Sequence, residues 1–177
     1  MRLLLALAIV GAPAVPATAG YWNYNDWHVS TDQIDTGEDL RVTCYAHTGG
    51  DGDPVWSLEV SNGDAGPPDF FPAPRLVEIA PSRHQTQMYD QQDITFAFDS
   101  GTTIQGIAEA HVNNEGFFQA ESGPQYNSVV SMLIAMRRGN TVEALGDGEV
   151  IATASLAGFT AAYGKMMDEC GFTLSMN

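Results

Sequence analysis

Apolar and polar residues alternate along much of this 177-residue chain, which is the pattern of β-strands that bury one face. The clearest alternation covers 40–47, where every second residue is apolar: Leu40, Val42, Cys44 and Ala46. A turn rich in glycine and aspartate follows, and then a second strand over 55–61, so these two strands are predicted to form a hairpin. Further strands are predicted over 75–80, 94–99, 102–112, 117–121, 141–145 and 149–155, with a bulge at Gly106.

Three segments beside these strands lack a clear period. Residues 20–27 are rich in aromatic residues and asparagine, and we expect this arm to bury its rings in the core rather than serve as a recognition arm. A strand begins at 27–29, and the four acids and one glycine of 30–39 predict a loop. Residues 62–74 hold four prolines and cannot form a helix; their two phenylalanines either fill the core or form an exposed contact. Exposed rings from these segments would make a candidate interaction surface: Trp22, Trp27, Phe70 and Phe71.

The hydrophobic period changes from two to about 3.6 in the last third of the chain. Residues 127–138 have an apolar stripe, a candidate cap at Ser128 and two arginines in the last turn, which favours a helix. A buried strand is the alternative there, because several of the apolar residues are β-branched. A second helix is predicted over 155–170, capped by Ser155 and ended by Gly171. Its buried face would hold Leu156, Phe159, Tyr163, Met166 and Cys170.

The order of these elements predicts a mostly β protein of the α+β type. Strands come first, and a helix, a hairpin and a final helix follow with mostly short connections. We therefore expect an antiparallel β-sandwich or barrel, with two helices near the C-terminus packed against it. The length of the chain after residue 19 suits one domain, 20–177.

Residues 1–19 have the layout of a cleavable secretory signal peptide. Arg2 supplies a positive charge, 3–10 form an apolar run, and 17–19 form an A-x-A cleavage signal. The apolar run is too short to span a bilayer. We therefore expect cleavage after Ala19 and a periplasmic or secreted protein.

Two cysteines, Cys44 and Cys170, predict one disulfide in an exported chain of this size, with two free buried thiols as the alternative. A bridge would fasten the last helix to the first clear strand. In the chain-entropy description, closing so long a loop stabilises the fold by roughly 5 kcal/mol. The spacing fits neither a C-x-x-C redox pair nor a zinc site.

The charge of the chain is strongly negative, with 22 acidic and 7 basic residues and a formal net charge of −15. The acids are scattered, which indicates a solvated acidic surface rather than a disordered tail. Such a surface argues against nucleic acid and anionic membranes, because both need lysine and arginine to meet their phosphates. It permits a basic protein partner in the cell envelope or a divalent cation, and it also fits a plain solubility role.

The sequence shows no catalytic motif. Nucleophile elbows, P-loops, dinucleotide fingerprints and zinc helices are absent. Asp51 and Asp53 provide too few ligands for an EF-hand loop, so a solvated turn is favoured there. The four histidines are far apart in sequence, and we expect no metal site, cofactor or catalytic residue. They are His28, His47, His84 and His111.

Several features in order resemble the invasion-associated locus B family of exported bacterial proteins. The matching pieces are Trp27-x-Val29, Cys44, and then 49–52, 77–81, 137–139 and 155–162. The resemblance implies a β-rich domain of the periplasm or outer envelope from an alphaproteobacterium-like source, and it implies no catalytic residue. The chain departs from the family pattern at 70–74 and 84–93 and is unusually acidic, so the invasion role of one member is not carried over.

The export signal, the cysteine pair and the missing motifs favour a non-enzymatic interaction or envelope-maintenance domain. One alternative is a small periplasmic hydrolase whose carboxylates converge only in the fold. Another is a carbohydrate- or peptide-binding module that uses the four exposed rings as a patch.

Overall fold

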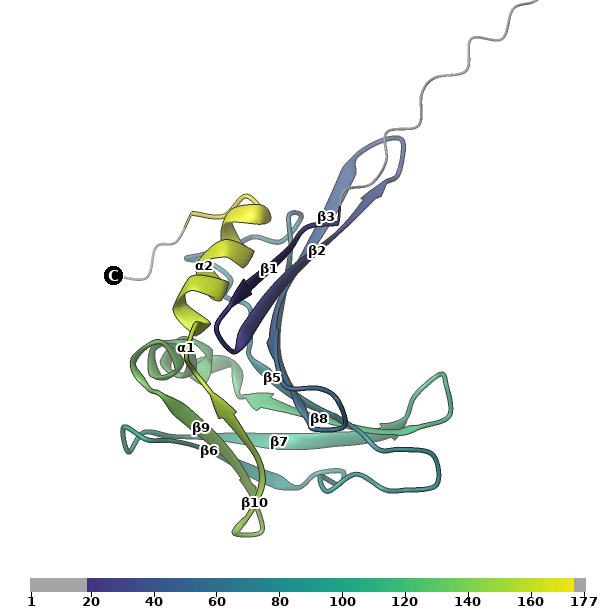
Figure 1. Cartoon of the computed structure of the whole chain (residues 1–177), viewed down its shortest axis with the longest axis vertical. Helices are drawn as coiled ribbons and strands as arrows, with labels where there is room; N and C mark the ends of the chain where they lie inside the picture. Colours follow the sequence, from purple (N-terminus) through teal and green to yellow (C-terminus); the bar gives the residue numbers. More distant parts are fainter. Residues whose placement is uncertain (1–18, 174–177) are drawn as a thin grey trace, which may run out of the picture.

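The computed structural model describes residues 19–173, which form ten strands and two α-helices (Figure 1). The predicted signal peptide lies outside the described residues, apart from Ala19. The helices are α1 (Val129–Arg138), which follows a short 3-10 turn, and α2 (Phe159–Glu169). The strands are β1 (Tyr21–Tyr24), β2 (Trp27–Asp35), β3 (Leu40–Thr48), β4 (Val55–Ser61), β5 (Arg75–Ile79), β6 (Asp93–Phe98), β7 (Thr103–Val112), β8 (Phe118–Pro124), β9 (Thr141–Gly146) and β10 (Glu149–Ser155).

The strands form one antiparallel sheet in the order β1-β2-β3-β4-β5-β8-β7-β6-β9-β10. This confirms the predicted β-rich α+β class with two helices near the C-terminus. The sheet is open, with β1 and β10 as its edges, and it is strongly bent. Because of the bend, β2 and β3 run at a steep angle to β7 and β8. The β2–β3 and β7–β8 hairpins therefore point in different directions (Figure 1).

The core lies on the face of the sheet that the helices cover, which we call the inner face. Trp27 of β2 packs edge-on against Phe159 of α2, with ring centroids 4.9 Å apart. Trp56 of β4 makes the same kind of contact with Phe96 of β6, at 5.4 Å. Since β4 and β6 are not neighbours in the sheet, the bend must bring their inner faces together.

Cys44 in β3 and Cys170 at the end of α2 form a disulfide, which confirms the predicted pairing. The bond joins positions 126 residues apart and leaves no free cysteine. Because α2 lies along β1, β2 and β3, the bridge fastens the helix to the strands that it covers. No helix within residues 19–173 has the length and apolar character that crossing a bilayer requires.

Two element boundaries differ from the prediction. The segment 30–35, expected as a loop, extends β2, because its backbone pairs with β3 as far as Asp35 opposite Leu40. The last helix begins at Phe159, so Ser155 ends β10 and does not cap the helix. Gly158 makes the turn between them with φ 95°, and a Cβ there would collide with the carbonyl oxygen of Tyr24. The helix therefore starts where only glycine allows the chain to turn.

Candidate functional site

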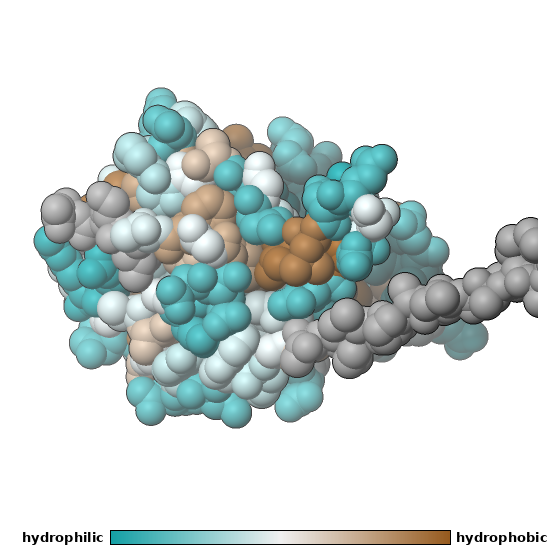
Figure 2. All heavy atoms as spheres, turned by 90° about the horizontal axis from the view of Figure 1, so that it is seen from above, coloured by the Kyte–Doolittle hydropathy of each residue, from teal (hydrophilic) through white to brown (hydrophobic). Residues whose placement is uncertain are grey.

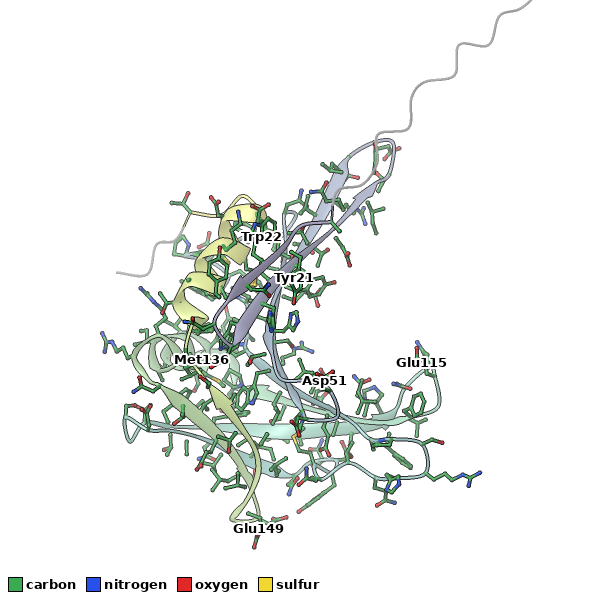
Figure 3. All side chains as sticks on the ribbon, in the orientation of Figure 1. Tyr21, Trp22, Asp51, Glu115, Met136 and Glu149 are labelled. Carbon is green, nitrogen blue, oxygen red and sulfur yellow. A yellow bond between two sulfur atoms is a disulfide. The ribbon has the colours of Figure 1, made fainter. Side chains whose placement is uncertain are left out.

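The four aromatic residues proposed as an interaction surface do not form one patch. Trp27 is fully buried, so its assignment to an exposed surface is wrong: it packs on α2, and its indole N–H donates to the Ser155 carbonyl oxygen (2.9 Å). Trp22 and Phe71 are partly buried and pack against the core, whereas Phe70 is 38% exposed. Figure 3 shows Trp22 on the side of β1 that faces α2, and Tyr21 on the other side. The ring of Trp22 also lies under the ammonium of Lys165, 4.4 Å from its centroid.

A row of polar residues instead crosses the outer face, which is the face of the sheet opposite the helices. Five residues on five successive strands are direct cross-strand partners. Because side chains alternate between the two faces of a strand, all five project from the outer face. We call this set the polar row: Asn23, His28, His47, Ser57 and Arg75.

The histidines of the polar row lie in a line of neighbouring aromatic rings. Tyr21 stacks on His28 with centroids 5.8 Å apart, and the His28 and His47 rings are 5.5 Å apart. Nδ1 of His28 lies 2.5 Å from Oδ1 of Asn23, so Nδ1 donates, since an amide oxygen only accepts. Burial lowers the pKa of His47, and the neighbouring His28 lowers it further, so the row favours a neutral imidazole at this position.

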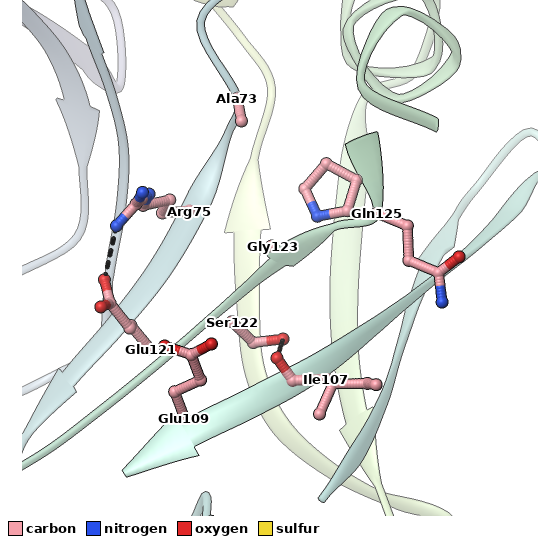
Figure 4. Close-up of a pocket in the computed structure, with 9 residues that line it drawn as sticks. Ala73, Arg75, Ile107, Glu109, Glu121, Ser122, Gly123 and Gln125 are labelled. Atoms are coloured by element: carbon pink, nitrogen blue, oxygen red, sulfur yellow. Dashed lines mark hydrogen bonds and ion pairs between the residues drawn. The ribbon is translucent and has the colours of Figure 1, made fainter. Parts of the chain in front are cut away.

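The polar row ends at a surface hollow of about 290 Å³ on β5, β8 and β7 (Figure 4). The guanidinium of Arg75 pairs with the Glu121 carboxylate at 2.9 Å. Glu109 on β7 is the direct cross-strand partner of Glu121, so the two carboxylates lie side by side. Ile107 and Pro124 supply apolar wall to the same hollow. Two acids and one cation thus share a small space that also has apolar walls.

Further carboxylates lie on the outer face away from the hollow. On β3, Tyr45 is flanked by Glu59 and Asp32, and the pKa of its phenol is raised by burial first and then by these two charges. Within residues 19–173, neither of these acids nor Glu109 is part of a salt bridge. The outer face therefore holds more negative than positive charge and favours a cationic ligand.

The hollow places two carboxylates beside one guanidinium. Among residues 19–173, no group of three histidine, cysteine, aspartate or glutamate side chains has the spacing that holds a metal ion. The hollow is suited to hold a cation between carboxylates.

Sequence reasoning missed this site because the row depends on strand register. The alternation of 40–47 correctly placed His47 on the polar face. Nothing in the sequence, however, sets His28 opposite His47, or Arg75 opposite Ser57. The predicted loop over 30–39 also left only residues 27–29 for the strand that contains His28, whereas that strand continues to Asp35.

Comparison of the chain with family models, curated proteins and solved structures finds no match. The function is therefore inferred from the outer face and its charges.

Proposed function

We propose that this protein is an exported, non-enzymatic binding domain that recognises a basic protein partner in the cell envelope. The observation that carries the proposal is the hollow on the outer face, where Glu109 and Glu121 face one cation, Arg75. One more positive charge in the hollow would balance the second carboxylate.

The lining of the hollow fits the side chain of a lysine or arginine. Such side chains lay their aliphatic stems on apolar surface and keep the charged end near water or an anion. Ile107, 45% exposed, and Pro124 would contact the stem. Glu109 would then receive the cationic end beside the existing Arg75–Glu121 pair.

The rest of the surface would assist such a partner. The net charge of −15 attracts a basic protein over a distance that shortens as salt rises, to about 10 Å at 0.1 M. Seen from above, hydrophilic residues cover much of the surface and surround an apolar patch near its middle (Figure 2). Binding by charge is favoured because acidic residues outnumber basic ones by 22 to 7.

Export is supported by the disulfide, since such bonds persist in oxidising compartments. Cleavage after Ala19 would leave Gly20 as the first residue. The nitrogen of Gly20 donates to Oγ1 of Thr31 (2.9 Å), and its oxygen accepts from the Thr31 amide (3.0 Å). Both bonds would be kept in the mature chain, which would begin where the sheet begins.

The experiment is a cross-linking pull-down from the cell envelope at low and moderate salt. We expect a basic protein that is recovered at low salt and lost as salt rises. Glu109→Gln should weaken its binding by about 1 kcal/mol, or roughly fivefold. Glu115→Gln is the matched control, because Glu115 lies at the far tip of the β7–β8 hairpin (Figure 3).

Two results would contradict the proposal. If the partner bound equally at both salt concentrations, the acidic face would not be its docking surface. If Glu109→Gln and Glu115→Gln weakened binding equally, the hollow would have no specific role.

A further inference from the structure

The bent sheet does not close, and its open seam leaves a groove beside the edge strand β10. Residues 151–155 of β10 line one side, and Thr48, Asp53 and Trp56 from the β3–β4 hairpin line the other. The groove encloses about 410 Å³ and shares no residue with the hollow on the outer face. We call it the seam groove.

Strand β10 directs unpaired backbone groups toward the seam groove. Backbone N–H and C=O groups of an edge strand point alternately to its neighbour and away from it. The Leu156 amide donates to Asn140 on the β9 side, whereas the Ser155 oxygen accepts from Trp27 on the other side. Thr153, two residues before Ser155, therefore turns its N–H and C=O away from β9. No loop or turn within residues 19–173 provides a backbone partner for them.

A buried donor on the opposite side of the groove is also unsatisfied. Trp56 is 1% exposed, and its indole N–H has no hydrogen-bond partner within the described residues. Buried N–H groups are nearly always paired, so this one needs an explanation. Trp56 lines the groove, so a ligand bound there would lie against this residue.

The charge of the seam groove is negative. Asp26 and Asp53 line it, and none of its lining residues is lysine or arginine. Neither aspartate takes part in a salt bridge within residues 19–173. An occupant that supplies both backbone groups and positive charge would satisfy the strand edge and the carboxylates together.

We propose that the seam groove binds an extended basic peptide segment of a partner protein, which adds a strand to β10. The peptide backbone pairs with Thr153, and its lysine or arginine side chains reach Asp26 and Asp53. In this mode of recognition the backbone supplies affinity and the alternate side chains supply specificity. The inference does not depend on the hollow, because the two surfaces have no residue in common.

The test uses three synthetic peptides and the purified protein with its disulfide intact. The first peptide alternates lysine and valine, and the second replaces each lysine by glutamate. The third is the lysine peptide with all of its backbone nitrogens methylated, so that neither edge can donate a hydrogen bond. Binding is followed by NMR, through the Trp56 indole N–H signal and hydrogen exchange of the Thr153 amide. We expect the lysine peptide alone to shift the indole signal and to protect the Thr153 amide.

A pair of variants separates the groove from the general charge of the chain. Asp53→Asn should weaken binding of the lysine peptide about two- to fivefold. Asp51→Asn is the matched control, because it removes the same charge from the same turn without lining the groove. Glu109→Gln should leave the shift of the Trp56 indole signal and the protection of the Thr153 amide unchanged, because Glu109 does not line the seam groove. These two signals therefore separate this test from that of the proposed function.

Three outcomes would overturn the inference. The first is equal binding of the lysine and glutamate peptides. The second is saturable binding that leaves the Thr153 amide exchanging freely. The third is a dimer in sedimentation analysis whose Thr153 amide is protected before any peptide is added, since the edge would then belong to a second copy of the chain.

Discussion

At the scale of single residues, His47 links the polar row to the stability of the fold. Burial and the neighbouring His28 lower its pKa in the folded chain. The unfolded chain therefore takes up a proton at higher pH, near the ordinary histidine value of about 6.5. The contribution of His47 to the free energy of unfolding should therefore be largest above about pH 6.5. It should fall as the pH drops from about 6.5 to the pKa of His47 in the folded chain, and below that pKa this residue should cause no further change.

The variant His47→Gln should lose this part of the pH dependence. Urea unfolding midpoints at pH 7.5 and pH 5 would measure it, and the difference between them should be smaller in the variant. His84→Gln is the control, because His84 is exposed in the connection between β5 and β6. Equal differences in the two variants would show that His47 does not cause the dependence.

At the scale of elements, alternation and period predicted most strands and both helices. Period two identified β3, β4 and the β9–β10 hairpin, because each buries one face. The segment 30–35 was missed because its composition is polar, and only its pairing with β3 makes it a strand. Local pattern therefore identifies an element that buries its own apolar face, but not one that depends on its partner's hydrogen bonds.

Gly106 shows the same limit. A glycine inside a strand predicted a bulge, yet β7 pairs regularly with β6 and β8 at this residue. A Cβ at this position would collide with the carbonyl oxygen of Gly123 and approach the Phe96 ring. The glycine is needed for close packing inside the bent sheet, and the register shift occurs between Val150 and Ala152 of β10. The sequence cannot distinguish these two uses of glycine.

The disulfide is the element-scale link whose removal should cost most. Replacing both cysteines, Cys44→Ala with Cys170→Ala, removes a restraint on the unfolded chain across 126 residues. We expect the free energy of unfolding to fall by about 5 kcal/mol, measured by urea unfolding. Reduction of the native protein under the same conditions is the control and should give a similar loss. Thiol titration of unfolded, unreduced protein should find no free cysteine; two free thiols would refute the bridge.

At the scale of the whole molecule, neither candidate site could be predicted from the sequence. The hollow needs Glu121 of β8 between Arg75 of β5 and Glu109 of β7, so it depends on strand order as well as register. The seam groove depends on the bend that brings β10 near the β3–β4 hairpin. The excess of negative charge, by contrast, is evident from the sequence. It is the reason why a basic partner is proposed for both surfaces.

The excess of charge should also affect the stability of the molecule as a whole. With a net charge of −15, folding brings carboxylates closer together, and their repulsion opposes the compact state. Only three salt bridges occur within residues 19–173, and exposed pairs of this kind contribute little. Screening should therefore relieve more repulsion than attraction, and added NaCl should raise the urea midpoint at pH 7.

The measurement compares urea midpoints at about 0.01 M and 0.3 M NaCl, between which the screening length falls from roughly 30 Å to less than 10 Å. The control is the same comparison near pH 4, where about half of the carboxylates are protonated and the salt effect should shrink. A midpoint that falls with salt at pH 7 would mean that the few ion pairs outweigh the repulsion. In that case the carboxylates would not add up to a strong negative potential around the molecule. Attraction of a basic partner by the net charge would then not be supported.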